Sequence, residues 1–382
     1  MLIQYRDQAM KPAIPPSPPH KGRGAVSNIQ GRFEHQLRED FDDGWERYTD
    51  GTDPSTGKLQ TVVTEEVARS ILTWNKSPDV PFNVSLNPYR GCEHGCIYCF
   101  ARPTHSYLEL SPGLNFETRL FAKVNAADLL RRELAKPSYH PEPIALGVNT
   151  DAYRPCERQW RITRSVLEVM HECGQPVGLI TKSSLIERDI DLLAPMAQKR
   201  LAAVTITITT LDHDIARTLE PRAASPTRRL QTIRRLTEAG IPVSVNVAPV
   251  IPFVTDQDLE HILDEAFSAG AVAANYIILR LPWEVSPLFQ EWLAAHFPDR
   301  AERVMNRIRD MRGGKDYEAT FGVRMRGQGV WAELIRQRFR AALKKSGVEG
   351  RMAEFTELDC SHFRRPQVVR VAANSSGQLD MF

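Results

Sequence analysis

Residues 84–100 read VSLNPYRGCEHGCIYCF. The apolar start, residues 84–86, is typical of a short buried strand. Three cysteines follow within eight residues: Cys92, Cys96 and Cys99 are separated first by three residues and then by two. Thiolates this close in sequence are typical ligands of iron–sulfur clusters or zinc, not a disulfide framework. The stretch therefore predicts a metal or cluster site on the connection that follows the first strand of a sheet.

The composition is that of an ordinary globular protein. The chain has 382 residues, of which 42% are hydrophobic and 25% charged, so it has enough apolar material for a sizeable core. A formal net charge of +2 gives no support for a surface that binds polyanions over the whole molecule. No apolar run is long enough to span a membrane, and the first residues lack the apolar segment of a signal peptide. We therefore expect a cytoplasmic protein without a membrane partner.

Downstream of the cysteines, short β-branched segments alternate with segments of helical periodicity. The strand-like segments are residues 84–86, 144–148, 177–180, 204–208, 243–247 and 276–279. Such alternation predicts an α/β fold with a parallel sheet. Since only about six units can be recognised, we expect a partial (β/α)6 TIM-type barrel, with the cysteines on its first βα connection.

The chain divides into five predicted parts. Residues 1–35 are rich in proline and are expected to form a disordered arm. Residues 36–80 form a lead-in, with a short helix expected from Glu65 onward, and residues 81–285 form the core barrel. Residues 286–372 form a helical, basic C-terminal extension, and 373–382 a free tail. Residues 321–350 include seven basic and two acidic side chains. This excess predicts either a phosphate or nucleic-acid contact or merely a solvated helix face.

The cysteine spacing resembles the signature of the radical S-adenosylmethionine (radical SAM) superfamily, C-x3-C-x-aromatic-C, with Tyr98 at the aromatic position. The resemblance implies that Cys92, Cys96 and Cys99 hold a [4Fe–4S] cluster whose fourth iron binds S-adenosylmethionine. One electron, from a donor such as flavodoxin or ferredoxin, would then cleave the cofactor. The resulting 5′-deoxyadenosyl radical would abstract hydrogen from a substrate.

Within that superfamily, residues from about 85 to 285 resemble the spore photoproduct lyase-like branch and a bacterial group without an assigned reaction. The likeness rests on the cysteines, on short polar segments at the predicted strand ends, and on Glu220-Pro221 with Arg229. It implies S-adenosylmethionine contacts at residues of these segments, and a structural Glu220–Arg229 ion pair. The predicted cofactor-binding residues are Tyr98, Asn149, Thr150, Asp151, Lys182, Thr207 and Thr209.

At one position this sequence differs from the spore photoproduct lyase-like branch. The lyase returns hydrogen from a cysteine just ahead of its Thr-Ser-Asp segment, where this chain has Val148. Cys156, eight residues later, is the candidate for that role, and the resemblance assigns no other catalytic residue. The substrate therefore stays unidentified, with nucleic acid as the class that the branch suggests.

Two other interpretations stay open. In one, the protein is a non-catalytic nucleic-acid adaptor, whose cysteines hold a metal such as zinc and whose basic C-terminal helix contacts phosphates. In the other, it binds cluster and cofactor but has lost turnover, since the glycine pair and glutamate expected after the second strand are absent. A brown cluster protein and a colourless zinc protein are easily told apart.

Overall fold

The computed structural model describes residues 19–34, 52–53, 58–348 and 358–367. The strands are β1 Thr52–Asp53, β2 Lys58–Leu59, β3 Val62–Glu66, β4 Leu72–Trp74, β5 Val84–Leu86, β6 Tyr89–Arg90, β7 Arg119–Lys123, β8 Ile144–Leu146, β9 Val177–Thr181, β10 Ala202–Thr207, β11 Val243–Val250 and β12 Ala273–Ile278. The α-helices are α1 Leu114–Thr118, α2 Ala126–Leu134, α3 Glu157–Trp160, α4 Ile162–Cys173, α5 Ile190–Gln198, α6 His213–Leu219, α7 Pro226–Glu238, α8 Leu259–Ser268, α9 Val285–His296, α10 Ala301–Asp310 and α11 Gly329–Lys345. The 3₁₀ helices are η1 Arg102–Leu108, η2 Ser184–Asp189, η3 Asp256–Asp258 and η4 Pro298–Arg300.

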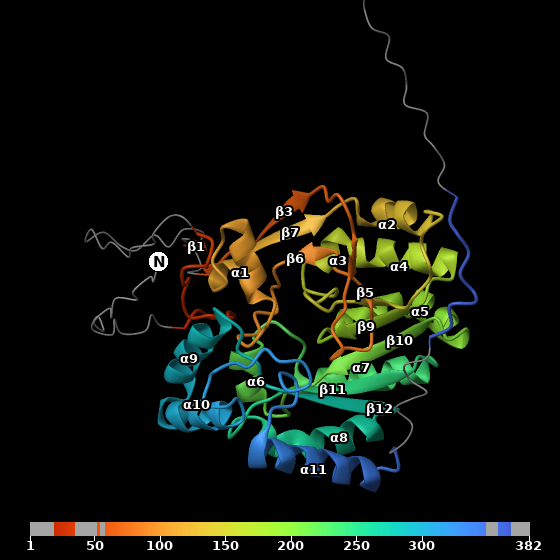
Figure 1. Ribbon diagram of the computed structural model, residues 1–382. Coiled ribbons are helices and arrows are strands. Elements are labelled where there is room, and N and C mark those ends of the chain that lie inside the picture. The colour runs from red at the N-terminus through yellow and green to blue at the C-terminus, as the bar shows by residue number, and fades with distance from the viewer. Residues whose placement is uncertain (1–18, 35–51, 54–57, 349–357, 368–382) are drawn as a thin grey trace, which may run out of the picture.

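A seven-stranded sheet organises the molecule (Figure 1). Its order is β12-β11-β10-β9-β8-β5-β4, and all neighbours pair in parallel except β4, which is antiparallel to β5 at the edge. The six parallel strands lie at the six segments expected from the sequence. The predicted α/β fold with a six-unit partial barrel is thus confirmed.

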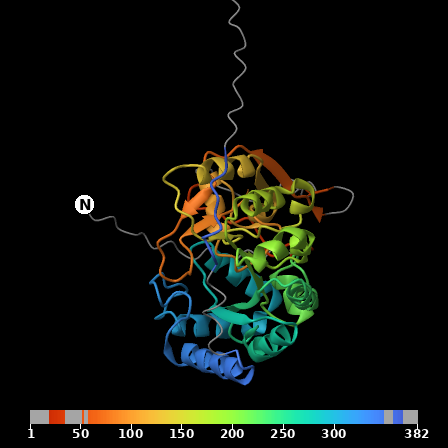
Figure 2. The same cartoon turned by 90° about the vertical axis from the view of Figure 1, so that its right-hand side faces the viewer.

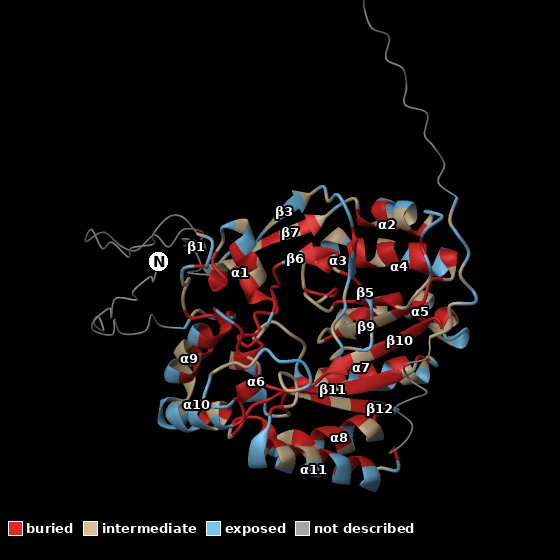
Figure 3. Cartoon of the chain, viewed as in Figure 1, coloured by how far each residue is buried: buried red, intermediate tan, exposed pale blue. Residues whose placement is uncertain are grey.

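The two faces of the sheet carry different side chains. Leu86, Leu146 and Leu179 are level across neighbouring strands and belong to the apolar core that the helices complete. Figures 2 and 3 show these helices around the outside, with buried positions concentrated on the strands and exposed positions on the outer helix faces. On the alternate positions, small residues such as Ala145 and Gly178 line the inner side of the barrel. The period-two alternation of strands therefore leaves space inside the barrel.

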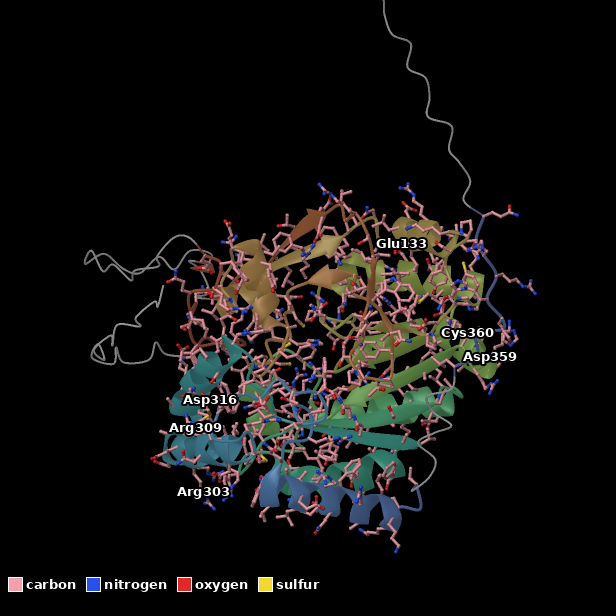
Figure 4. The ribbon with its side chains drawn as sticks, viewed as in Figure 1. Glu133, Arg303, Arg309, Asp316, Asp359 and Cys360 are labelled. Atoms are coloured by element: carbon pink, nitrogen blue, oxygen red, sulfur yellow. The ribbon has the colours of Figure 1, made fainter. Side chains whose placement is uncertain are left out.

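The lead-in differs from expectation because it forms strands where a helix was predicted. β3 pairs in parallel with β7, and the chain then joins the main sheet as β4. Between them, the carboxylate of Glu133 on α2, labelled in Figure 4, accepts a hydrogen bond from Ile71 N at 2.8 Å. In a helix these backbone amides would be hydrogen-bonded to nearby carbonyl oxygens. Here distant residues accept their hydrogen bonds, and the local periodicity of the sequence does not indicate such partners.

Part of the predicted arm is packed against the protein. Residues 1–18 and 35 lie outside the described residues, but 19–34 run along the cysteine loop, which we define as residues 87–100. Arg23 is buried and donates to the carbonyl oxygen of Glu117 at 2.9 Å. A Cβ on Gly24 would stand only 1.8 Å from the carbonyl oxygen of Gly95. The proline-rich composition therefore does not describe this segment, because it is held by contacts with residues far along the chain.

The C-terminal extension is helical as expected, but most of its positive charge is paired. α11 lies alongside α8 in Figure 1, and Arg338 and Lys345 form ion pairs with Glu260 and Asp264 on that helix. Four of the seven basic side chains between 321 and 350 are in ion pairs: Arg324, Arg336, Arg338 and Lys345. The structure thus favours a solvated helix face over a phosphate-binding strip. The tail, 373–382, lies outside the described residues.

The helices in the described ranges include none with the length and hydrophobicity needed to cross a bilayer.

Candidate functional site

A cavity of about 1140 Å³, solvent at its mouth included, opens at the carboxyl ends of the parallel strands. In parallel α/β barrels this end carries the binding and catalytic residues. The lining combines polar strand ends with the cysteine loop and includes Cys92, His94, Cys96, Tyr98, Cys99, Phe100, Asn149, Thr150, Asp151, Lys182, Thr207, Asn246, Ala248, Arg280 and Met325.

The cysteine loop brings its three thiols to this cavity. Cys92 N donates to the carbonyl oxygen of Phe116 at 2.9 Å, and Cys99 N donates to that of Cys96 at 3.2 Å. Gly91, just before the first cysteine, has φ +70°, and a Cβ there would lie 2.8 Å from the oxygen of Phe116. Only glycine allows both this backbone conformation and this close approach.

Arg102 holds the loop in place from beneath. It is fully buried and donates to the carbonyl oxygens of Gly95 and Cys96 at 3.0 and 2.9 Å. Its charge is balanced by the buried carboxylate of Glu117 at 2.5 Å. That carboxylate also accepts hydrogen bonds from the amides of Gly24 and Ala25. Arg102 is thus part of the scaffold of the cysteine loop.

His94 and Asp151 set the electrostatics around Cys92. His94 Nδ1 lies 3.3 Å from the carboxylate of Asp151, which also accepts from Thr181 Oγ1 at 2.7 Å and from Lys182 N at 2.8 Å. Burial alone would lower the pKa of His94, but Asp151 and Cys92 raise it to about 9. Burial would raise the pKa of the Cys92 thiol, but His94 and then Arg154 lower it. The surroundings thus favour the thiolate of Cys92, the form that binds metals, whereas burial raises the pKa of the Cys96 and Cys99 thiols.

A second buried network supports Tyr98. Its hydroxyl donates to Glu220, which is ion-paired with Arg229, and lies 3.2 Å from Thr209 Oγ1. The predicted Glu220–Arg229 pair is therefore present. Lys182 Nζ lies 5.7 Å from the centre of the Tyr98 ring. Burial would lower the pKa of Lys182, but Cys96 and Glu220 raise it, so the ammonium stays charged beside the cysteines.

The remaining predicted residues divide into two groups. Asn149 and Thr207 line the cavity, and no hydrogen bond from either side chain is found among the described residues. Thr150 also lines it, but its hydroxyl donates to the carbonyl oxygen of Tyr89 at 3.1 Å. Thr209 is outside the lining, and its hydroxyl has two possible acceptors for its one proton, Glu220 at 2.6 Å and Ala248 O at 2.9 Å. Cys156 is also outside the lining, and burial raises the pKa of its thiol to about 12.

Three residues of the cavity lining were not among the site residues predicted from the sequence. Asn246 points inward from β11, and its buried Oδ1 has no hydrogen-bond partner among the described residues. Arg280 lies two residues beyond the end of β12, so its position near a strand end, like that of Lys182 after β9, could have identified it. Met325 comes from the C-terminal extension, 45 residues further on. Nothing in the local sequence indicates that Met325 reaches the cavity.

A second metal site near Cys360 finds no support in the described residues. Figure 4 shows Cys360 beside Asp359 at the edge of the molecule, and Asp359 lies 3.8 Å from His362 Nε2. Across the described ranges, the cysteine loop included, no three Cys, His, Asp or Glu side chains are grouped closely enough to hold a single ion. An iron–sulfur cubane differs from a single ion in that each thiolate binds its own iron.

Comparison with known proteins identifies the family. A family model described as the radical SAM superfamily matches residues 86–266. An uncharacterized protein of Mycobacterium tuberculosis (strain H37Rv) is 37% identical over 234 residues, which cover 60% of this chain and 69% of that protein. The chain belongs to the radical SAM superfamily. A radical SAM Nalpha-GlyT isomerase of Pseudomonas phage M6 is 28% identical over 203 residues, covering 52% of this chain and 39% of the isomerase.

Solved structures of radical SAM proteins support the fold. Spore photoproduct lyase complexed with dinucleoside spore photoproduct superposes with a TM-score of 0.52 at 13% identity, covering 74% of this chain and 79% of the lyase. A cysteine-to-serine mutant of that lyase gives 0.53 at 14% identity with the same coverage. At this identity the likeness shows the fold alone.

The family implies S-adenosylmethionine and an iron–sulfur cluster as cofactors, and the residues present fit both. Three thiols from one loop face one cavity, and among the described lining residues no fourth cysteine joins them. Three thiolates leave one position of a cubane cluster open to an external ligand. Lys182 and Asn149 offer a cation and an amide in the same cavity, as the carboxylate and amino groups of an amino acid require.

Proposed function

We propose that this chain is a radical SAM enzyme in which Cys92, Cys96 and Cys99 hold a [4Fe–4S] cluster. The observation that carries the proposal is that the three thiols of one loop face the cavity at the carboxyl ends of six parallel strands. With both cofactors bound, one electron from a donor such as flavodoxin or ferredoxin would cleave the carbon–sulfur bond of S-adenosylmethionine, giving methionine and a 5′-deoxyadenosyl radical that takes hydrogen from a substrate.

The residues of the chain would hold and orient these partners. Lys182 would pair with the carboxylate of the cofactor, and Asn149 with Thr207 would contact its polar groups. His94, fixed by Asp151, would keep Cys92 in its thiolate form. The apolar part of the lining would exclude water from a reactive radical.

The proposed substrate class is nucleic acid, with a lyase- or repair-like reaction. It is supported by the bound dinucleoside in the structure of spore photoproduct lyase, which shares this fold. Neither Val148 nor Cys156 supplies the hydrogen donor expected at the matching position, so the reaction itself would differ from photoproduct repair.

The test is anaerobic. The protein is reconstituted with iron and sulfide, reduced and given S-adenosylmethionine, and 5′-deoxyadenosine is quantified by mass spectrometry. We expect a brown protein that forms the product. A colourless protein that retains zinc would contradict the proposal and support the adaptor alternative. A fully loaded cluster that yields no product, even with oligonucleotide present, would support a cofactor-binding protein without turnover.

Cys96→Ala should abolish both the cluster and the product, because a cubane held by only two protein thiolates lacks its ligand set. Iron and sulfide content and the visible spectrum measure the first effect, and 5′-deoxyadenosine the second. Cys360→Ala is the matched control, since Cys360 lies outside the cavity lining. A full cluster in Cys96→Ala would contradict the three-ligand assignment.

A further inference from the structure

Arg280 is a cation of the cavity wall without a counter-ion. Among the described residues no carboxylate lies within ion-pair distance of its guanidinium. Its Nη atoms reach only the thioether sulfur of Met325 and the hydroxyl of Tyr317, both at 3.4 Å. Its Nε is buried and without a partner in the described parts of the chain. Arg280 is half-buried, and a partly desolvated charge with neither a counter-ion nor a full set of hydrogen bonds is less favourable than a paired one.

A second guanidinium adds to the positive charge near Arg280. Arg312 is 1% exposed and donates to the carbonyl oxygen of Leu279, the residue before Arg280, at 2.8 Å. Burial, and then the charge of Arg280, lower the pKa of Arg312 to about 10. Arg312 lies behind Arg280, outside the cavity lining, and we call the two residues the arginine wall. Of the acids nearby, Asp79 is already paired with Arg324.

Other buried arginines of the site are compensated. Arg102 faces Glu117, and Arg229 faces Glu220. Arg154, also fully buried, has no acid partner among the described residues but donates to the carbonyl oxygens of Gly91 and Asp151. Arg280 has neither an acid nor a carbonyl oxygen in the described parts of the chain, so a ligand can complete its set of partners. A guanidinium matches the geometry of an oxyanion such as phosphate.

An aromatic surface adjoins the free cation. Phe100, at the end of the cysteine loop, lines the same cavity and is 42% exposed, and the guanidinium carbon of Arg280 lies 5.4 Å from its ring centre. A cation for phosphate beside an exposed ring for base stacking is the pairing that single-stranded nucleic acids use. This combination favours a nucleotide over a simple carboxylate.

We propose that Arg280, backed by Arg312 and flanked by Phe100, forms a substrate subsite that binds a backbone phosphate of a nucleic acid. This inference deepens the proposed function and rests on it for the identity of the cavity. It predicts that binding depends on the charge of the phosphodiester and not only on the bases.

The test uses a fluorescently labelled single-stranded oligothymidylate of five nucleotides and its uncharged methylphosphonate analogue. Binding to the reconstituted protein is measured anaerobically with S-adenosylmethionine present. Loss of a charge-assisted contact at a desolvated site should make Arg280→Gln bind the charged probe about 10- to 100-fold more weakly. The slope of log affinity against log salt should fall by about one. Arg336→Gln, which removes a charge paired with Glu333 on the surface of α11, should bind like wild type.

Several results would overturn the proposal. They are equal binding of the charged and neutral probes, wild-type affinity in Arg280→Gln, and no oligonucleotide binding by the wild type. A matching loss of S-adenosylmethionine affinity in Arg280→Gln would assign this residue to the cofactor instead. Arg280-dependent binding of an acidic peptide, without oligonucleotide binding, would identify the anion as a carboxylate.

Two measurements on the wild-type protein distinguish failure of the phosphate subsite from failure of the proposed function. If it forms 5′-deoxyadenosine but does not bind the probe, the radical chemistry stands and the phosphate subsite is wrong. If it binds the probe through Arg280 but forms no product, the subsite stands and the radical chemistry is wrong.

Discussion

The two walls of the cavity differ in how their buried charges are balanced. Around the cysteine loop three buried cations have an acid of the chain beside them, in the pairs Arg102–Glu117, His94–Asp151 and Arg229–Glu220, and the fully buried Arg154 donates to the carbonyl oxygens of Gly91 and Asp151. At the arginine wall, Arg312 is likewise held by carbonyl oxygens, whereas Arg280 has neither an acid nor a carbonyl oxygen as partner among the described residues. Charged side chains that are paired within the chain keep their positions before any ligand binds. An unpaired cation gains an interaction partner when an anionic ligand binds. Under the proposed function, the balanced residues would form a scaffold for the cofactor and Arg280 a surface for the substrate.

Breaking an ion pair beside the cysteine loop should have the largest effect on stability. In Glu117→Gln, Arg102 would stay fully buried without a counter-ion, so the free energy of unfolding should fall by about 3–5 kcal/mol. Denaturant unfolding measures the loss. Glu66→Gln removes the partner of Arg90 in an exposed pair and should cost less than about 1 kcal/mol. Equal losses in the two variants would show that the walls do not differ in this way.

Removing a charge from the arginine wall should hardly change stability. Arg280→Gln deletes a cation that no carboxylate of the described chain balances, so the free energy of unfolding should change by less than about 0.5 kcal/mol. The same denaturant series, without oligonucleotide, measures it. A loss as large as that of Glu117→Gln would mean that Arg280 is part of the scaffold.

Cys156→Ala should have the smallest effect, because Cys156 lies outside the cavity lining. We expect the amount of 5′-deoxyadenosine formed from S-adenosylmethionine to stay at the wild-type level. Complete loss of product, with the cluster still loaded, would place Cys156 in the active site and would require the loop after Asp151 to move.

Much of the cofactor side could be predicted from the sequence because it is local. Three cysteines on one loop, and polar residues at the ends of strands, occupy positions fixed by strand–loop spacing, so Lys182 and Asp151 were expected at the mouth of the barrel. Their roles were harder to predict. Asp151 was predicted to contact the cofactor, but four donors of the chain already engage its carboxylate: His94, Thr181 and the amides of Tyr153 and Lys182.

The sequence by itself determined the strand–helix order, the parallel sheet and the loop that carries the thiols, since these follow from periodicity and short spacing. Only the tertiary structure decided which charges are balanced. Whether Arg102 or Arg280 has a counter-ion depends on residues brought near from elsewhere in the chain, such as Glu117 for the first. Burial turns that pairing into a large free-energy difference, and burial is a property of the packed molecule, not of any stretch of sequence.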